Sequence, residues 1–461
     1  MSHLNIFNSL SQKKSQLKTV VPGHVKMYVC GMTVYDHCHI GHARVLVFFD
    51  TFVKILEWLG YEVEYVRNVT DVDDKIIKKA IESNKSSKEV SDFYMNAMLE
   101  DEHSLGVKKP HHLPRATEYI SEMIEMIQVL MDKGHAYQTE SGDVCFSVES
   151  NPQYGQLANQ KLDQLIHGQR VASDAGKKHP MDFVLWKPSK PNEPSWPSPF
   201  GQGRPGWHIE CSAMATSVLG QTLDIHGGGL DLKFPHHENE IAQSECAIGH
   251  SYVNHWMHVG HVQINKEKMS KSLGNFITIR DMLKHHHSET LRYFILSSHY
   301  RSPLAYSMAK LDQAKQALSK LYISIKGLDQ VQLDFKSENS DEFKSFMEDD
   351  INIPGAISVL FKLAKTINQC KLNNDTSLAS KYAGELKTLG GLLGLLQVNP
   401  DEYLQGDVSI DVKFVEEQIA HRNQARLDKD YALADQIRSE LAALGIELED
   451  QQGKTTWRSV L

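Results

Sequence analysis

The spacing of apolar residues changes twice within residues 25–67, and this limits the fold more than any other feature of the chain. Residues 25–29 alternate between apolar and other side chains, which predicts a strand. Apolar residues then recur at helical spacing over 41–59, and Gly60 follows as a stop signal. Residues 61–66 alternate again. A strand, a helix and a strand within about 40 residues predict a parallel sheet of the Rossmann type.

The same pattern resumes late in the first half of the chain. Residues 223–226 predict a strand, three glycines follow at 227–229, and 236–248 has helical spacing. The intervening segment carries seven of the chain's 15 prolines between 180 and 205. Because proline removes a ladder donor, we expect this segment to be irregular and to form a stiff insertion.

We therefore expect an α/β Rossmann-type domain with an insertion, then a helical bundle and a small C-terminal domain. The expected divisions are 1–110 for the first half of the α/β domain, 111–205 for the connective insertion, 206–265 for the second half, 266–310 for a loop region, 311–400 for the helical bundle, and 401–461 for the C-terminal domain.

Composition restricts the classes of partner and compartment. The formal net charge is −9, so a nucleic acid would need a locally basic face on this chain. The sequence has no run of 18 apolar residues, and its polar first 16 residues do not resemble a secretory signal. Six cysteines in 461 residues do not make a disulfide framework, so we expect a cytoplasmic protein whose thiols are free or bound to metal.

A phosphate site is predicted where the first strand's loop enters its helix, at His39-Ile40-Gly41-His42. A helix N-terminus attracts anions, and Gly41 lets a ligand approach the backbone. His39 and His42 share one face of the first turn and can donate to charge on phosphorus. The alternative, a capping and packing role for both histidines, is equally consistent with this stretch alone.

A second phosphate element is predicted at Lys268-Met269-Ser270-Lys271-Ser272, followed by Gly274. Two lysines on a flexible loop suit a clamp on a polyphosphate. A solvated basic loop is the alternative for any isolated stretch of this kind. Its occurrence after the histidine element, on the other half of an α/β sheet, favours the clamp.

Cys30, Cys211, His236 and Glu240 form a candidate zinc set. His236 and Glu240 are four residues apart and project from one helix face, although His237, three residues from Glu240, also shares that face. The two cysteines are far apart in the sequence, so spacing alone leaves the metal open.

The two phosphate elements together resemble the HIGH and KMSKS signatures of class I aminoacyl-tRNA synthetases. Further stretches resemble the cysteinyl-tRNA synthetases in particular, namely Met27-Tyr28-Val29-Cys30-Gly31, Arg67-Asn68-Val69-Thr70-Asp71, Gly206-Trp207-His208-Ile209-Glu210-Cys211 and Phe234-Pro235-His236-His237-Glu238-Asn239-Glu240. The resemblance implies activation of L-cysteine by ATP with Mg²⁺, transfer to tRNA-Cys, and one Zn²⁺ per chain that selects the substrate thiol. It also implies that Cys30, Cys211, His236 and Glu240 hold that zinc. The α/β domain is then catalytic, residues 266–310 carry the KMSKS loop and contact the tRNA stem, and residues 401–461 bind the anticodon.

Other roles also follow from the resemblance. It implies catalytic roles for His39, His42, Lys268 and Lys271, ATP contacts at Gly41, Gly227, Gly228 and Lys271, and substrate contacts at Thr70, Trp207 and Asp231. Outside the two histidines of the HIGH element, a packing role is an equal alternative for the pocket residues. Trp457 near the C-terminus either stacks on exposed bases or packs against the surface.

Two rival functions fit parts of this pattern. One is a ligase of the same fold that joins activated cysteine to an amino-sugar, which would not need the long C-terminal segment. The other is a catalytically silent RNA-binding relative, against which the complete signatures argue. We expect a monomer that acts on ATP, L-cysteine and tRNA-Cys and has no membrane partner.

Overall fold

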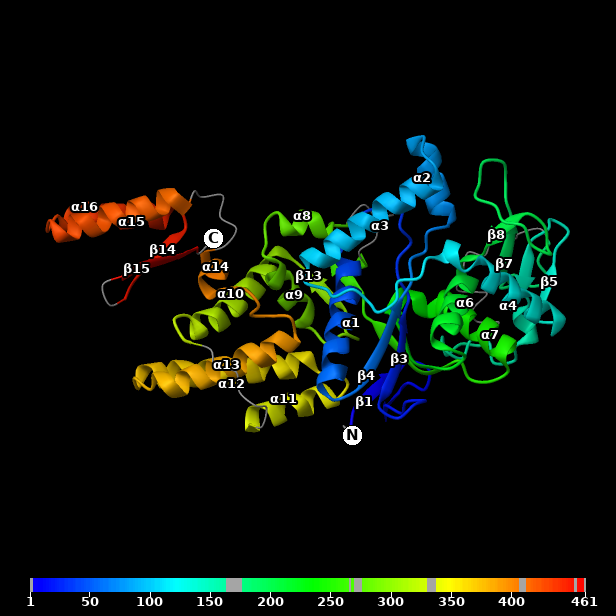
Figure 1. The fold of residues 1–461 in the computed structure, drawn as a ribbon, viewed down its shortest axis with the longest axis horizontal. Helices are drawn as coiled ribbons and strands as arrows, with labels where there is room; N and C mark the ends of the chain where they lie inside the picture. Colours follow the sequence, from blue (N-terminus) through cyan, green and yellow to red (C-terminus); the bar gives the residue numbers. More distant parts are fainter. Residues whose placement is uncertain are drawn as a thin grey trace. The chain divides into compact units, whose positions relative to one another are not determined.

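The structure is a computed structural model that describes residues 3–162, 176–264, 267–268, 276–329, 337–405, 412–451 and 454–459. Its ribbon is shown in Figure 1. The chain divides into two compact units. The first comprises residues 1–280, 295–306 and 344–356, and the second comprises residues 281–294, 307–343 and 357–461.

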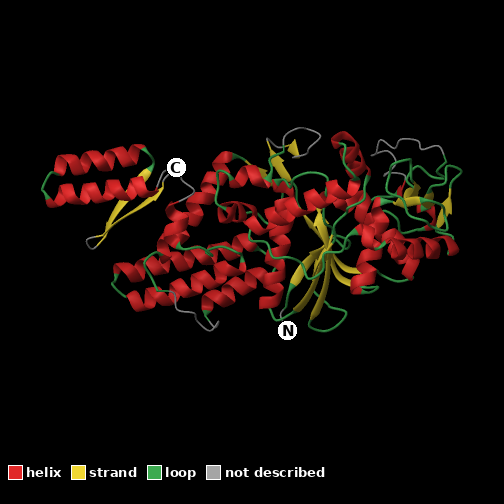
Figure 2. Ribbon diagram, turned by 45° about the horizontal axis from the view of Figure 1, so that its top comes forward, coloured by secondary structure: helices red, strands yellow, loops and turns green. Residues whose placement is uncertain are grey.

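A four-stranded parallel sheet lies at the centre of the first unit (Figure 2). Its strands are β3 (His24–Val29), β4 (Glu62–Arg67), β9 (Leu223–Gly229) and β10 (Val253–Val259), in the spatial order β10-β9-β3-β4. All neighbouring pairs are parallel. The predicted Rossmann-type sheet is therefore confirmed, and the strand order reverses between β3 and β9.

Helix α1 (Ile40–Trp58) connects β3 to β4, as predicted. Its apolar face is fully buried, including Phe48, Phe49 and Phe52. The helix ends before Gly60, whose φ of +90° is a backbone conformation that favours glycine. Helix α7 (Glu238–Ile248) makes the equivalent connection from β9 to β10. Both connections direct the carboxyl ends of the strands towards one edge of the sheet.

The proline-rich insertion is more regular than expected. It contains the antiparallel sheet β5 (Ala136–Gln138), β6 (Val144–Phe146), β7 (Phe183–Pro188) and β8 (Gly203–Pro205). The expectation of an irregular 180–205 segment is wrong at β7 and β8, where Pro188 and Pro205 are the last residues of their strands, and it holds for residues 189–202, which form no helix or strand element. A proline at the end of a strand costs the ladder little.

Further elements complete the first unit. They are the hairpin β1 (Asn5–Asn8) and β2 (Lys13–Gln16), the small sheet β11 (Val262–Ile264), β12 (Glu267–Lys268) and β13 (Leu304–Tyr306), and the helices α2 (Asp74–Ser83), α3 (Ser87–Ser104), α4 (Ile120–Asp132) and α6 (Trp207–Leu219). Short helical turns are η1 (Ala116–Glu118), η2 (Val148–Ser150), η3 (Leu230–Leu232) and η4 (Lys233–His237).

The second unit is mostly helical, as expected. The helices that lie wholly or partly in it are α8 (Ile279–Leu283), α9 (Ser288–Leu296), α10 (Met308–Ile325), α11 (Glu338–Glu348), α12 (Ile353–Leu372), α13 (Thr376–Leu392), α14 (Pro400–Gln405), α15 (Val412–Leu427) and α16 (Tyr431–Ala443). A strand pair follows as β14 (Ile446–Gln451) and β15 (Lys454–Ser459).

Trp457 belongs to a small apolar core at the C-terminal end. It is 4% exposed and shares this core with Val415, Ile437 and Leu448. Of the two roles considered for Trp457, the structure thus supports packing and not an exposed stacking surface. None of the helices in the described part of the chain is long and apolar enough to cross a membrane.

Candidate active site and metal centre

A cavity of about 500 Å³ lies at the carboxyl ends of the parallel strands, where the strand order reverses. This edge is where open α/β sheets bind their ligands. The predicted site residues that line the cavity are Cys30, His39, Gly41, His42, Thr70, Trp207, Cys211, Asp231 and His236. Residues predicted from separate parts of the sequence therefore share one cavity.

His39 is the N-cap of α1. Its Nδ1 accepts hydrogen bonds from the backbone N–H groups of Gly41 and His42, at 3.1 and 3.4 Å, and its own N–H donates to His42 Nδ1 at 3.2 Å. The two imidazole rings stack with centroids 3.7 Å apart. The N–H groups of Gly41 and His42 thus already donate to His39. His39 therefore caps the helix and also lines the cavity.

The four predicted zinc ligands meet in one buried cluster. One ligand atom from each of Cys30, Cys211, His236 and Glu240 lies within 4.8 Å of all the others. The two Sγ atoms are 3.5 Å apart, and His236 Nε2 lies 3.1 Å from Glu240 Oε1. Zinc bonds of 2.0–2.3 Å place neighbouring tetrahedral ligands roughly 3.3–3.8 Å apart, so this donor set fits the ion.

Charge in the cluster is distributed unevenly. Burial raises the pKa of the Cys211 thiol, but hydrogen bonds with Cys30 and His236 outweigh burial and bring this pKa to about 6. Burial lowers the pKa of His236, but the charge of Glu240 reverses the effect and raises that pKa to about 10. A thiolate is the form of cysteine that binds metal, so Cys211 is prepared to act as a ligand.

His236 is held in place from its other side. His236 Nδ1 lies 3.0 Å from His208 Nδ1, and the indole of Trp207 stacks on the His236 ring with centroids 4.2 Å apart. Burial holds the pKa of His208 well below its usual range, so its neutral ring can accept from His236. Metal-binding histidines are commonly oriented by such a hydrogen bond from the second ring nitrogen.

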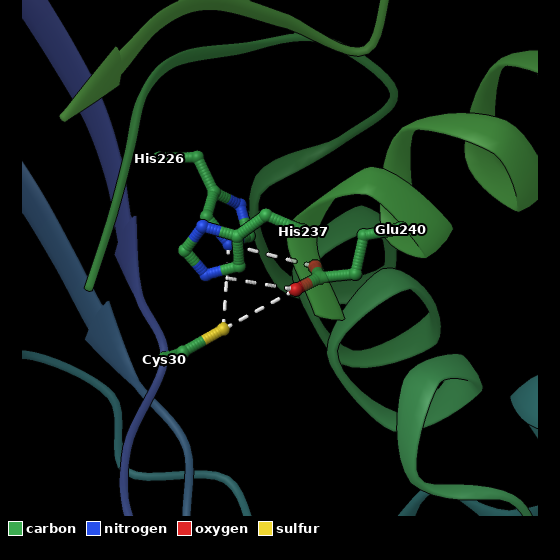
Figure 3. A group of neighbouring side chains, drawn as sticks. All are labelled: Cys30, His226, His237 and Glu240. Carbon is green, nitrogen blue, oxygen red and sulfur yellow. Dashed lines mark hydrogen bonds and ion pairs between the residues drawn. The ribbon is translucent and has the colours of Figure 1, made fainter. Parts of the chain in front are cut away.

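A second donor set overlaps the first (Figure 3). It consists of Cys30, His226, His237 and Glu240, all buried, and it shares Cys30 and Glu240 with the predicted zinc ligands. The sequence indicated His237 only as a substitute for His236. The structure places both histidines near Glu240 Oε1, with His236 Nε2 at 3.1 Å and His237 Nε2 at 3.9 Å.

Thr70 is fixed by a buried carboxyl group that the sequence analysis did not single out. Thr70 Oγ1 donates to Glu210 Oε2 at 2.9 Å, and Asn68 Nδ2 donates to Thr70 Oγ1 at 3.3 Å. Burial raises the pKa of Glu210 well above its usual range. Glu210 directly precedes Cys211 in α6, and the sequence signals for it were this position and its place in the family-like stretch 206–211.

The glycines after residue 226 lie differently from the expectation. They form the end of β9 instead of following it, and Gly229, but neither Gly227 nor Gly228, lines the cavity. A Cβ at Gly227 would lie 2.2 Å from the Phe49 ring, and one at Gly228 would lie 3.0 Å from His237 Cε1. Close packing therefore accounts for these two glycines, and their predicted contact with ATP stays a prediction.

The KMSKS element lies mostly outside the described residues. Lys268 ends β12, which pairs with β11, and nothing is described of its side chain. Residues 269–275, including Lys271, are outside the described ranges. Their predicted role in binding the phosphates stays a prediction.

Comparison with known families matches three successive parts of the chain. Residues 16–316 match the family described as the tRNA synthetases class I (C) catalytic domain. Residues 342–397 match the DALR domain, and residues 415–458 match the cysteinyl-tRNA ligase anticodon binding domain.

Full-length relatives are also found. The chain is 52% identical over 464 residues to the cysteine–tRNA ligase of Alkalilimnicola ehrlichii and 53% identical over 456 residues to that of Halorhodospira halophila. Each alignment covers 99% of both chains.

Solved structures share the fold at low sequence identity. The methionyl-tRNA synthetase of Mycobacterium tuberculosis aligns with a TM-score of 0.56 at 12% identity, over 80% of this chain and 89% of that one. A putative arginyl-tRNA synthetase from Campylobacter jejuni aligns with a TM-score of 0.54 at 14% identity, over 81% and 94%. With the matched domains and the full-length identity, these findings show that the chain belongs to the cysteine–tRNA ligase family of class I tRNA synthetases.

Proposed function

We propose that this chain activates L-cysteine with ATP and transfers it to tRNA-Cys, with zinc selecting the substrate thiol. The observation that carries the proposal is a cluster of four side chains, Cys30, Cys211, His236 and Glu240. It lies beside a cavity that is also lined by the first residues of α1. The names of the close relatives and the match of residues 415–458 to an anticodon binding domain support tRNA as the acceptor.

The donor chemistry of the cluster supports zinc. Glu240 Oε2 is buried and has no hydrogen-bond partner among the described residues, as is common for an atom that binds an ion. Cys30 and Cys211 are free thiols at contact distance. Two sulfurs, one nitrogen and one carboxylate oxygen suit Zn²⁺, and they do not suit Mg²⁺ or Ca²⁺.

Zinc bound here would supply a soft Lewis acid that favours a thiolate over an alcohol. This chemistry addresses a problem that apolar packing cannot solve, because cysteine and serine differ only in S and O. Cys211 and His236 belong to the cluster and also line the cavity. A substrate side chain in the cavity can therefore reach the position between them.

The chain's other residues would position the reactants. In the first step a carboxylate oxygen of cysteine attacks the α-phosphorus, the bond to the bridging oxygen breaks, and pyrophosphate leaves. The nucleophile is already an anion, so no general base is needed, and rate comes from orientation and charge stabilisation. His39 and His42 lie at the cavity wall where the α-phosphate would approach, and Mg²⁺ would accompany ATP.

Thr70 is the proposed contact for the substrate amino group. Its hydroxyl is oriented by Glu210, and it lines the same cavity as the thiols. Trp207 covers His236 and is 39% exposed, so its indole can cover a bound amino acid. Asp231, the other predicted substrate contact, and Gly229 line the same cavity. A monomeric state and a cytoplasmic location belong to the same proposal.

The test is ATP–pyrophosphate exchange with cysteine and with serine, before and after metal chelation, followed by charging of a tRNA-Cys transcript. We expect exchange with cysteine only, loss of that exchange on chelation, recovery with Zn²⁺, and stable charging of the tRNA. Exchange with serine at the same rate, or unchanged exchange after complete removal of metal, would refute the role of zinc. Exchange without charging would refute the tRNA acceptor and favour the amino-sugar ligase.

A further inference from the structure

Glu240 faces two different groups of side chains. Cys211 and His236 belong to the first group. His226 and His237 belong to the second, and Figure 3 shows both of these rings pointing towards Cys30 and Glu240. Cys30 belongs to both groups. The cluster therefore holds two overlapping sets of four metal-binding side chains.

The second set has the dimensions of a zinc site. Cys30 Sγ lies 3.4 Å from His226 Nε2 and 3.3 Å from Glu240 Oε1. His226 Nε2 lies 3.5 Å from Glu240 Oε2, and His237 Nε2 lies 3.9 Å from Glu240 Oε1. These separations are close to the roughly 3.3–3.8 Å expected between tetrahedral zinc ligands. One sulfur, two nitrogens and one carboxylate oxygen are also ordinary zinc donors.

His237 is oriented as a metal ligand would be. Its Nδ1 lies 2.9 Å from His258 Nε2, and His258 Nδ1 lies 2.8 Å from Ser9 Oγ. When His237 Nδ1 donates along this chain, the lone pair of Nε2 points into the cluster. His237 Nε2 is fully buried and has no hydrogen-bond partner among the described residues, and the same holds for Glu240 Oε2. Neither atom makes a hydrogen bond within the described ranges, and the contacts given above, at 3.9 Å for His237 Nε2 and 3.5 Å for Glu240 Oε2, are to other members of the second set.

The two sets differ in their access to substrate. Cys30, Cys211 and His236 line the central cavity, whereas His226 and His237 do not. An ion in the second set would lie behind the cavity wall. The structure therefore separates an outer position, where an ion can meet a substrate thiol, from an inner position, where it cannot.

We propose that the chain has an inner position for a divalent ion such as Zn²⁺, held by Cys30, His226, His237 and Glu240. Because Cys30 and Glu240 are shared, the two positions cannot both be complete, and the chain holds one ion at a time. When a ligand of the outer position is missing, that ion occupies the inner position. This proposal rests on the zinc site of the proposed function and adds a second place for that ion.

The experiment measures zinc bound by the full-length chain after dialysis, in the wild type, Cys211→Ser, His237→Ala and the double variant. We expect about one zinc per chain in the wild type and in each single variant, because each single variant keeps one complete set. We expect the double variant to lose the ion. A Cys211→Ser chain as empty as the double variant overturns the proposal, and so does a double variant that keeps the ion.

The wild type and His237→Ala serve as controls. A wild-type chain without zinc would refute the zinc site of the proposed function, whereas loss confined to Cys211→Ser would refute the inner position alone. If Cys211→Ser fails to fold, the His236→Ala variant loaded with Co²⁺ tests the inner position instead, because it also lacks one ligand of the outer position. A sulfur-to-cobalt charge-transfer band of one thiolate supports the inner position, and the intensity of two thiolates overturns it.

Discussion

The guanidinium of Arg44 donates to the carbonyl oxygen of His261 at 2.8 Å, which fixes helix α1 to the segment that leaves β10. The same guanidinium also contacts the carbonyls of His299, Tyr300 and Ser302, just before β13. Arg44 is 1% exposed, and burial lowers its pKa to about 10. It thus connects the helix that starts at His39 with β11 and β13, the strands next to the KMSKS segment.

Replacing Arg44 by alanine should slow cysteine activation. The two phosphate elements would lose a common support, and a displacement of about 1 Å between reacting groups can cost roughly a hundredfold in rate. We expect kcat of ATP–pyrophosphate exchange to fall by a factor of about ten to one hundred, with little change in KM for cysteine. Millimolar guanidinium, but not urea, should restore part of the rate.

The matched control for Arg44 is Lys54→Ala in the same helix, where the lysine pairs with Asp50. We expect its exchange rate to equal that of the wild type. Equal loss in both variants, or an Arg44→Ala enzyme with full rate, would contradict the connecting role of Arg44.

Cys30→Ser should remove the metal and the discrimination against serine together. Cys30 is common to both donor sets, so its loss leaves neither complete. We expect the ratio of kcat/KM for cysteine over serine to fall at least about a hundredfold, because oxygen and sulfur then differ only in packing. Zinc content and exchange with both amino acids measure the outcome.

Cys246→Ser is the control for that change. Cys246 is half-buried, lies outside both donor sets, and has a pKa raised to about 11 by burial and by Glu245. Its substitution should leave zinc content and discrimination unchanged. Zinc retained by Cys30→Ser would contradict both proposed metal positions.

Lys271→Ala tests the KMSKS prediction, which the described residues leave open. If Lys271 stabilises the leaving pyrophosphate, the substitution should lower the exchange rate by roughly a hundredfold, the usual cost of one charged donor. Cysteine binding, followed by calorimetry without ATP, should change little. A full exchange rate would refute this role.

Trp457→Ala should weaken tRNA charging without affecting adenylate formation. The indole lies in the C-terminal core with Val415 and Ile437, so its removal should cost about 3–5 kcal/mol there. Hydrogen exchange should show faster opening of α15 and β14, with no change around the parallel sheet. Unchanged protection of α15 would contradict the packing role.

The C-terminal strands should also respond to acid. Hydrogen bonds from Arg422, at 2.8 and 3.0 Å, hold the pKa of Asp450 well below its usual range. A carboxyl group with a lowered native pKa contributes stability that is full above its ordinary pKa and is lost as pH falls through the native value. Since Asp450 is partly exposed, the contribution should be at most about 1 kcal/mol.

The measurement is hydrogen exchange of β14 in the wild type and in Asp450→Asn. At pH 7 the variant should open faster. The difference should shrink as pH falls below about 4, where the Asp450 carboxyl of the opened segment takes up a proton while the native carboxylate is still ionised. A difference that stays constant down to pH 2 would contradict this account.

The parallel sheet and one pair of the four outer ligands could be predicted from short-range signals in the sequence. Alternating residues at 25–29 and helical spacing at 41–59 predict β3 and α1 directly. His236 and Glu240 lie one helical turn apart, and the family resemblance supplied the distant cysteines. The predicted strand and helix place Cys30 and His39 at the carboxyl end of β3, and the resemblance brings Cys211, His236 and Glu240 to the same place.

Other features depend on contacts between distant segments, which spacing does not record. Arg44 has no signal beyond being a charged residue in an apolar helix, and its carbonyl partners lie more than 200 residues away. His258 and Ser9, which orient His237, are 249 residues apart. The prolines of β7 and β8 were misinterpreted because their number does not tell whether they stand inside a strand or at its end.

The N-cap position of His39 changes how substitutions there must be chosen. Alanine would remove the imidazole from the cavity and, at the same time, the acceptor for the first N–H groups of α1, so slower catalysis would have two explanations. Asparagine is a good N-cap without an imidazole, and the comparison of His39→Asn with His39→Ala separates the two effects. Only activity lost in both variants belongs to the chemistry of the ring.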